Sequence, residues 1–238
     1  MKTNYLIKLI FLFLIGMSFN SFILRAQETK KVAVSNFSGV SVSTGIDLYL
    51  TQGSTESARI EAADGVIDQV EVTVKDNNLA VKFRESNGLT NMWKNRKAKV
   101  YVTYKKLNSI SATSGSSAVT ENILKTDKLS ARVTSGADLK LNVVCNDLDV
   151  QATSGADANL SGKATNIDFK ATSGADIKAY ELVTDYGRVT VTSGADIKLT
   201  VNKGLETTST SGGSIRYKGG ASLNNHSSSR TGDVRRAD

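Results

Sequence analysis

The tripeptide Thr-Ser-Gly recurs six times in the second half of this chain, and four copies extend to Thr-Ser-Gly-Ala-Asp. The copies begin at Thr113, Thr134, Thr153, Thr172, Thr192 and Thr210, so the steps are 21, 19, 19, 20 and 18 residues. A period close to 20 residues is typical of a solenoid, in which each repeat forms one coil. The repeat therefore predicts a stack of coils.

Apolar and polar residues alternate on both sides of each tripeptide. Around the copy at Thr134 the apolar positions are Leu129, Ala131 and Val133 before it and Ala137, Leu139 and Leu141 after it. A period of two indicates β-strands with one buried face. Two or three such short strands cannot bury that face within one repeat, so successive coils must share a core. The pattern predicts an all-β fold, a parallel β-helix with about 19–20 residues per coil.

The glycine of each copy lies between two alternating runs, which suggests a corner where positive φ is needed. Equivalent Thr, Ser and Asp residues of successive coils should then stack at one strand spacing, with hydroxyls bonded to their neighbours. The predicted structural ladder comprises Ser114, Gly115, Ser135, Gly136, Asp138, Ser154, Gly155, Asp157, Ser173, Gly174, Asp176, Ser193, Gly194, Asp196, Ser211 and Gly212.

Stacked aspartates also suggest two kinds of chemistry, paired-carboxylate hydrolysis of glycosides and binding of a hard cation. An active site requires unlike environments for its two acids, whereas these aspartates have nearly identical neighbours. Lys140, Lys178 and Lys198 follow three of the four aspartates by two residues and can neutralise them. The only histidine, His226, lies in a Ser-rich tail. We therefore predict no catalytic residue, no metal ligand and no cofactor.

Residues 1–26 have the pattern of a secretory signal peptide. Lys2 and Lys8 flank the start of an apolar stretch that ends near Leu24-Arg25-Ala26, and cleavage is expected after Ala26. Its removal lowers the net charge from +7 to +4, because Lys2, Lys8 and Arg25 are lost and no acid is. No later stretch is long enough to cross a bilayer. We expect a protein secreted across the inner membrane, in the periplasm or at the cell surface.

Residues 27–107 contain strands without the strict repeat. Ser43-Thr44-Gly45 resembles a degenerate copy of the tripeptide, and a hairpin is expected with Asp76-Asn77-Asn78 as its turn. We interpret 27–107 as an irregular β region that caps the solenoid, 108–220 as the solenoid, and 221–238 as a polar tail or last coil.

The segment before the repeats holds the one distinctive surface candidate. Trp93, with Lys94 and Arg96 beside it, could contact a sugar ring or lipid headgroups, and Trp93 could instead fold back over the end of the core. The partner is unknown, with carbohydrate and cell-envelope components as the candidates. Export and the modest net charge argue against nucleic acid.

The order of elements resembles a known family. A strand near Phe37-Ser38-Gly39-Val40, the tripeptide Gly45-Ile46-Asp47, a Val-rich hairpin and Ser-Gly coils are similar to the autotransporter adhesin head domain family, also called the head GIN domain. Here Asp47 replaces the Asn of the defining tripeptide. The resemblance implies a right-handed β-helix-like fold, an exported location and an adhesive role.

Taken with the repeats, these features predict an exported, non-enzymatic β-solenoid that acts as an adhesin-like binding protein of the cell envelope. Two other classes stay open: a carbohydrate-active β-helix enzyme that uses the stacked aspartates, and a purely structural envelope component.

Overall fold

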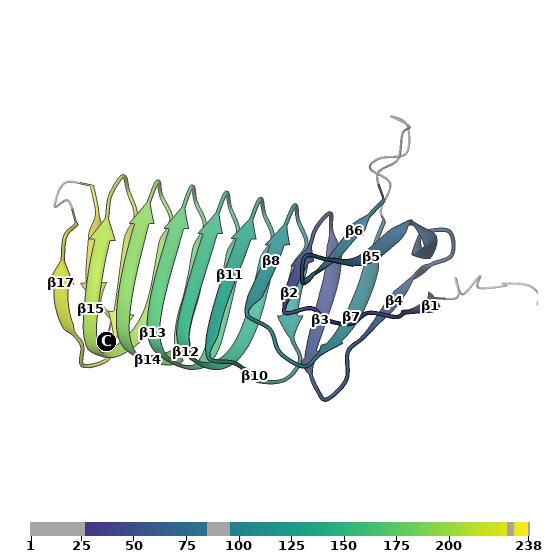
Figure 1. The fold of residues 1–238 in the computed structure, drawn as a ribbon. Coiled ribbons are helices and arrows are strands. Elements are labelled where there is room, and N and C mark those ends of the chain that lie inside the picture. The colour runs from purple at the N-terminus through teal and green to yellow at the C-terminus, as the bar shows by residue number, and fades with distance from the viewer. Residues whose placement is uncertain (1–26, 85–95, 228–230, 238) are drawn as a thin grey trace, which may run out of the picture.

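The computed structural model describes residues 27–84, 96–227 and 231–237, and these form a parallel β-solenoid of about seven turns (Figure 1). The expected fold class is confirmed. In the described residues one continuous sheet holds all the strands. In chain order they are β1 (Gln27–Val32), β2 (Gly39–Val42), β3 (Ile46–Gln52), β4 (Ser57–Ala63), β5 (Val70–Lys75), β6 (Asn78–Phe83), β7 (Ala98–Tyr104), β8 (Ser109–Thr113), β9 (Ser117–Thr120), β10 (Leu124–Lys125), β11 (Lys128–Thr134), β12 (Asp138–Thr153), β13 (Asp157–Thr172), β14 (Asp176–Thr192), β15 (Asp196–Ser209), β16 (Ser214–Lys218), β17 (Ser222–Asn225) and β18 (Asp233–Arg236). A short 3-10 helix, η1 (Ile67–Gln69), lies between β4 and β5.

Each regular coil is one long bent strand rather than the two or three short strands that the alternation predicts. The strands β12, β13, β14 and β15 each run from one Thr-Ser-Gly corner to the next or nearly so, and neighbours pair in parallel over most of that length. Without proline, every amide of the coil can join this ladder. A coil therefore has a single sharp corner and a broad bend.

The corner is a tight turn in which both central residues have left-handed backbone angles. Ser154 has φ of 58° and Gly155 has φ of 66°, and the other copies are alike. These are the angles of a type I′ turn. The glycine amide of each corner up to Gly194 donates to the serine carbonyl of the next, as Gly136 does to Ser154 at 3.1 Å, and the Gly212 amide donates to the Thr231 carbonyl at 2.6 Å. The expected corner is confirmed, and its backbone polar groups are paired along the stack.

The core is the continuous inward face of the coils. Alternate residues of each strand are buried, and Phe169 is fully buried between its register partners Val150 and Val189. The same row continues to Ala131 and to Thr207. One large ring is accommodated because its neighbours above and below are small.

The solenoid extends into the irregular region, but not in chain order. The strand β2 lies between β6 and β8, and β3 lies between β7 and β9. Thr44 and Gly45 have φ of 62° and 70°, and the Gly45 amide donates to the Ser114 carbonyl at 3.2 Å. The degenerate copy at Ser43-Thr44-Gly45 is thus a corner of the same stack.

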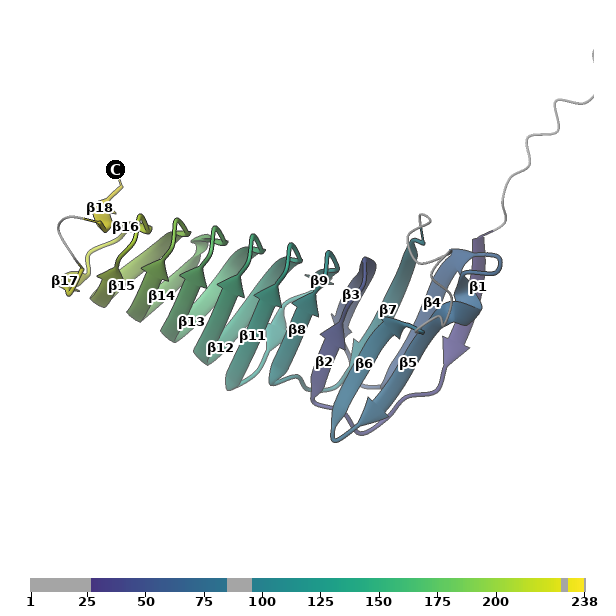
Figure 2. The ribbon, with the colours of Figure 1, turned by 90° about the horizontal axis from the view of Figure 1, so that it is seen from above.

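The two ends of the stack are built differently (Figure 2). At the first end, the antiparallel strands β1, β4 and β5 cover the coil of β6 and β7. The expected hairpin is β5 and β6, and its turn is Asp76-Asn77, because Asn78 already pairs with Lys75. At the other end, β17 and β18 pair in parallel with β15 and β16, so the described residues after 221 form a last coil.

The proposed signal peptide, residues 1–26, lies outside the described residues. No helix in the described part of the chain has the length and apolar character needed to cross a bilayer.

Candidate functional site

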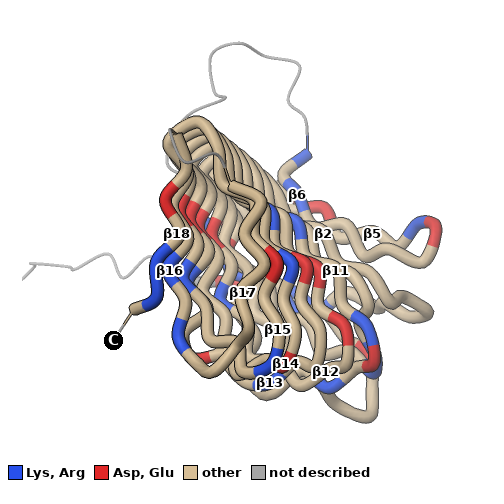
Figure 3. Tube along the Cα trace, turned by 90° about the vertical axis from the view of Figure 1, so that its left-hand side faces the viewer, with Lys and Arg blue, Asp and Glu red and all other residues tan. Residues whose placement is uncertain are grey.

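Two long faces meet at the line of corners. We call the strand segments that lead into the corners the front face; it comprises β8, β11, residues 147–153 of β12 and their register partners. The segments that leave the corners form the rear face, namely β9, residues 138–144 of β12 and their partners. Outward side chains of equivalent coils form rows along the axis, and charged rows run along both faces (Figure 3).

The front face carries an open groove of about 540 Å³ that crosses several coils, from β12 to β17. We call it the Tyr186 groove. Its outward lining includes Asp147, Asp149, Asp168, Tyr186, Arg188 and Glu206, and its floor includes Gly187 and Gly204.

The groove lies where the repeat changes on this face. One outward row runs Asp147, Asn166, Tyr186, Gly204 and Ser222, and the next runs Asp149, Asp168, Arg188, Glu206 and Asn224. The coil of β14 thus replaces an acidic or amide pair by Tyr186 and Arg188. Between them Gly187 replaces the Leu or Ile of its neighbours, and the side chains of Ile167 and Leu205 reach within 3.2 and 3.3 Å of where its Cβ would lie.

Tyr186 is half exposed, and glycine in the next coil leaves room beneath its ring. An ideal Cβ on Gly204 would lie 3.2 Å from Cδ1 of Tyr186. The Lys203 Nζ lies 5.7 Å from the ring centroid and pairs with Asp185 at 2.9 Å. With 50% of Tyr186 exposed, this arrangement offers an aromatic platform on the open side of the groove.

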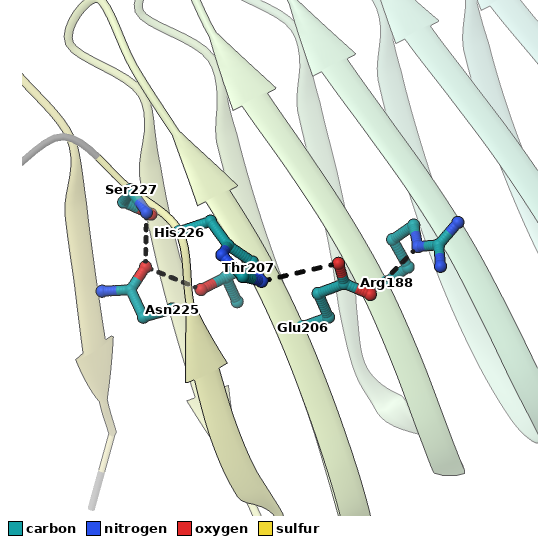
Figure 4. Close-up of polar contacts among 6 residues, drawn as sticks. All are labelled: Arg188, Glu206, Thr207, Asn225, His226 and Ser227. Atoms are coloured by element: carbon teal, nitrogen blue, oxygen red, sulfur yellow. Dashed lines mark hydrogen bonds and ion pairs between the residues drawn. The ribbon is translucent and has the colours of Figure 1, made fainter.

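A short polar chain connects the groove residues Arg188 and Glu206 to the last coil (Figure 4). The Arg188 Nε donates to Glu206 Oε2 at 3.2 Å, and His226 Nε2 lies 3.7 Å from Glu206 Oε1. The neighbouring Asn225 Oδ1 accepts hydrogen bonds from the Thr207 hydroxyl and the Ser227 amide, both at 3.0 Å. Glu206 is therefore held between two cationic side chains when His226 is protonated.

The opposite end of the groove is acidic. Asn166 Nδ2 donates to Asp147 Oδ1 at 2.8 Å, and Lys128 pairs with Asp147 at 3.1 Å. The Asn166 hydrogen bond and then Lys128 lower the pKa of Asp147 from its usual value. One carboxylate oxygen of Asp168 is buried and has no hydrogen-bond partner among the described residues. Carboxylates in this end can accept hydrogen bonds from a hydroxylated ligand.

The structure brings His226 to Glu206, which its place in a Ser-rich tail did not predict. The neighbouring Ser227 hydroxyl accepts from the Ser209 amide at 2.8 Å. Among the residues that the structure describes, no cluster of three or more His, Cys, Asp or Glu could hold a metal ion.

Of the predicted surface contacts, Trp93 and Lys94 lie outside the described residues. Arg96 packs at the first end of the stack, where its guanidinium lies 5.0 Å from the Phe83 ring and donates to Gln69 Oε1 at 3.0 Å. The structure does not bring Arg96 into the Tyr186 groove.

The aspartate ladder lies on the rear face. Asp138, Asp157, Asp176 and Asp196 are in register on successive strands. Lys178 lies between two of them, 2.8 Å from Asp157 and 3.9 Å from Asp176. The hydrogen bond to Asp157 raises the pKa of Lys178 above its usual value. This contact supports mutual neutralisation of acid and lysine rows in the middle of the ladder.

Sequence reasoning missed the Tyr186 groove. The available clue was the departure at Tyr186-Gly187-Arg188 from the equivalent Asp147-Leu148-Asp149 and Asn166-Ile167-Asp168. That departure marks a place where the outer surface differs while the coil continues.

A regular β-solenoid whose exposed faces carry open grooves belongs to the class of extended repeat scaffolds. Within that class, the chain belongs to the family described as "Putative auto-transporter adhesin, head GIN domain", whose model matches residues 36–221. The resemblance seen in the sequence is confirmed.

Solved structures share this fold. A "putative adhesin" from Bacteroides fragilis NCTC 9343 is 24% identical with a TM-score of 0.79, over 90% of this chain and 98% of that one. A "putative adhesin" from Parabacteroides merdae ATCC 43184 is 21% identical with a TM-score of 0.66, over 89% and 96%. A "putative lipid binding protein" from Parabacteroides distasonis ATCC 8503 is 13% identical with a TM-score of 0.68, over 89% and 97%. No curated protein sequence matches this chain.

Proposed function

We propose that this chain is an exported, non-enzymatic, adhesin-like protein of the cell envelope that binds carbohydrate in the Tyr186 groove. The observation that carries the proposal is the local break of the outward repeat at Tyr186-Gly187-Arg188, directly after a shift in the strand register between Thr184 and Tyr186. The half-exposed ring of Tyr186 lies over Gly204 at this break, which leaves an aromatic surface available to a ligand.

The chemistry of the groove suits a sugar chain. The exposed face of Tyr186 can stack against the C–H face of a sugar ring, as an aromatic ring with a polar tip does at wet interfaces. Asp149, Asp168 and Glu206 can accept hydrogen bonds from hydroxyls, and Arg188 can donate them. The groove volume of about 540 Å³ falls within the range of ligand sites. Successive coils repeat at about 4.8 Å, so the site can follow a linear chain along the axis.

Family membership supports the adhesive part of the proposal, because the matched family model carries that description. The predicted signal peptide, residues 1–26, supports export to the periplasm or cell surface. Protease treatment of intact cells, followed by detection of this chain, separates the two compartments.

The test of the groove is a glycan array on the purified protein, followed by titration of the best glycan against two variants. Tyr186→Ala should weaken binding at least about tenfold, since loss of an aromatic anchor commonly exceeds 1.4 kcal/mol. The matched control is Tyr180→Ala on the rear face, whose ring lies under Lys218 at 5.1 Å. It should bind the glycan as the unchanged protein does.

Three outcomes contradict the proposal. Cleavage of the bound glycan would make the chain a carbohydrate-active enzyme, the first alternative predicted from the sequence. Binding to phospholipid vesicles in place of glycans would assign the lipid role that one structural relative's description carries. An absence of binding to glycans, lipids and cell surfaces would leave the structural envelope component as the better reading.

A further inference from the structure

We propose that the rear face near the last coil is a second binding site, which takes a linear anionic glycan along a row of four cations. Lys178, Lys198, Arg216 and Arg235 occupy equivalent outward positions on β14, β15, β16 and β18. Each is in register with the next, so neighbouring cations repeat at about one strand spacing, roughly 4.8 Å. The row differs from the Tyr186 groove in two ways: it lies on the rear face, and its charge is positive rather than mainly negative.

Such a row is costly unless something neutralises it, because like charges directly opposite on neighbouring strands destabilise a sheet. The adjacent row is acidic and does this for part of the way, through Lys178 and its contacts with Asp157 and Asp176. The neutralising row is then interrupted. In the coil of β16 the position equivalent to Asp196 is Ser214, and the cation beside it is Arg216.

The cations at this interruption lack acidic partners within the described ranges. Lys198 and Arg216 form no ion pair there, whereas Arg235 bonds to Asp233 of its own strand at 2.7 Å. Lys218, two residues after Arg216, lies 5.1 Å from the Tyr180 ring and adds another positive charge nearby. The excess of positive charge is thus concentrated where the acidic row is broken.

A hollow of about 180 Å³ lies at the same place. Its charged lining is Asp176, Lys178, Asp196, Lys198 and Arg216. It has room for one carboxylate, sulfate or phosphate group with some water. A guanidinium binds such a group through two parallel hydrogen bonds, so Arg216 is the expected anchor and Lys198 supplies a point charge beside it.

The repeat of the row selects a linear ligand with regularly spaced acidic groups. A polysaccharide of acidic sugars has that form, and its anionic groups can meet successive coils. Single-stranded nucleic acid is the less suitable polyanion, because its recognition relies on aromatic rings that stack on bases. Beside the row, Tyr180 is a single ring that lines a hollow with Lys178 and Lys198 and has Lys218 Nζ 5.1 Å from its centroid, so it does not form a series of stacking rings.

The experiment compares four immobilised polymers with the purified protein: polygalacturonate, dextran sulfate, unsubstituted dextran and duplex DNA. We expect the first two to bind and plain dextran not to bind through this face, with affinity that falls as NaCl is raised. The first two arms distinguish carboxylate from sulfate as the preferred group. A preference for either supports the proposal.

The variant is Lys198→Gln with Arg216→Gln, and the matched control is Lys163→Gln with Lys170→Gln. The control removes the same charge from exposed lysines outside the row. The first double variant should weaken binding to the acidic glycan at least about tenfold, equivalent to about 1.4 kcal/mol, and the control less than about twofold. Both variants should melt as the unchanged protein does, because all four side chains lie on the surface.

If both double variants weakened binding to the acidic glycan equally, the binding would depend on net charge rather than on this row of cations, and the proposed site would be wrong. Unchanged binding in the Lys198 and Arg216 variant would lead to the same conclusion, as would tighter binding to duplex DNA than to either acidic glycan. These results are separable from the Tyr186 test, because Tyr186→Ala should leave acidic-glycan binding intact and the rear-face variant should leave the front-face glycan bound.

Discussion

Truncation of Phe169 to alanine tests how the solenoid is stabilised. Its ring is fully buried, with Val150 and Val189 as partners in the coils on either side. Continuous backbone ladders hold those coils at a fixed spacing, so the space left by the ring cannot collapse. Phe169→Ala should therefore lower the free energy of unfolding by about 3–5 kcal/mol. For a domain of this size, 1 kcal/mol corresponds to about 2–4 °C, which gives a fall in Tm of about 6–20 °C.

The assay is thermal unfolding followed by circular dichroism, with two comparison variants. Phe169→Leu fills most of the space and should lose less than about half as much. Tyr186→Ala removes a ring of similar size that is 50% exposed, and its Tm should stay within about 3 °C of the unchanged protein. A Phe169→Ala variant that melts like Tyr186→Ala would show that the coils relax around the cavity, and the reasoning from fixed coil spacing would fail.

Two further results are expected. At Gly162, where φ is 109°, a Cβ would lie 2.1 Å from the Val143 carbonyl oxygen, so Gly162→Ala should lower Tm strongly. The control is Gly155→Ala, whose Cβ meets no atom within 4 Å and which should lose only about 1–2 kcal/mol because of its left-handed backbone. An equal fall in Tm for the two variants would contradict this prediction. Burial, followed by the charges of Asp147 and Asp127, raises the pKa of the Cys145 thiol to about 11, so alkylation at pH 8 should be about 100-fold slower in the folded protein than after unfolding. The free energy of unfolding should fall between about pH 9 and 11, because the thiol of the unfolded chain ionises at lower pH than that of the folded protein. Rapid labelling of the folded protein would refute this prediction.

The solenoid could be predicted because the residues that determine it lie close together in the sequence and recur in every coil. Each coil carries the same alternation of apolar and polar residues and the same Thr-Ser-Gly corner, so several copies indicate the same fold. The alternation described around Thr134 also makes Phe169, four residues before Ser173, an inward position, and Phe169 is fully buried. The left-handed angle of the serine before each corner glycine was missed, because glycine alone signals that conformation in a sequence.

The order of coils at the first end could not be predicted. The chain builds β2 and β3, leaves to form the antiparallel cap, returns as β6 and β7 on the far side, and then crosses to β8. Each of these strands has the same alternation, so the pattern fixes which face is buried but not which strand is its neighbour. The degenerate copy at Ser43-Thr44-Gly45 is the one sign in the sequence that this segment belongs to the stack. In the structure the Gly45 amide donates to the Ser114 carbonyl, which lies far away in the sequence.

The Tyr186 groove was missed for a different reason. Attention to a repeat favours what its copies share, and the aspartates of the Thr-Ser-Gly-Ala-Asp copies are on the rear face, where Lys178 neutralises two of them. The groove residues Tyr186, Arg188 and Glu206 lie at outward positions that the copies do not share. Departures from the repeat, not the repeat itself, would have located them.

This separation follows from the architecture. An inward residue of a solenoid must match the coils above and below it, because all share one core. At Gly187 the side chains of Ile167 and Leu205 reach within 3.2 and 3.3 Å of where a Cβ would lie. An outward residue meets solvent and has only neighbouring outward rows to satisfy. The exterior can therefore change coil by coil at little cost to stability. An acidic aromatic groove on the front face and a cation row on the rear face, in which Lys198 and Arg216 form no ion pair within the described residues, can coexist on one scaffold, each tunable without disturbing the other. The rear-face variants test that independence directly: if loss of Lys198 and Arg216 altered ligand binding at Tyr186, the two faces would have to be coupled through the core, and the separation argued from the stacked coils would be wrong.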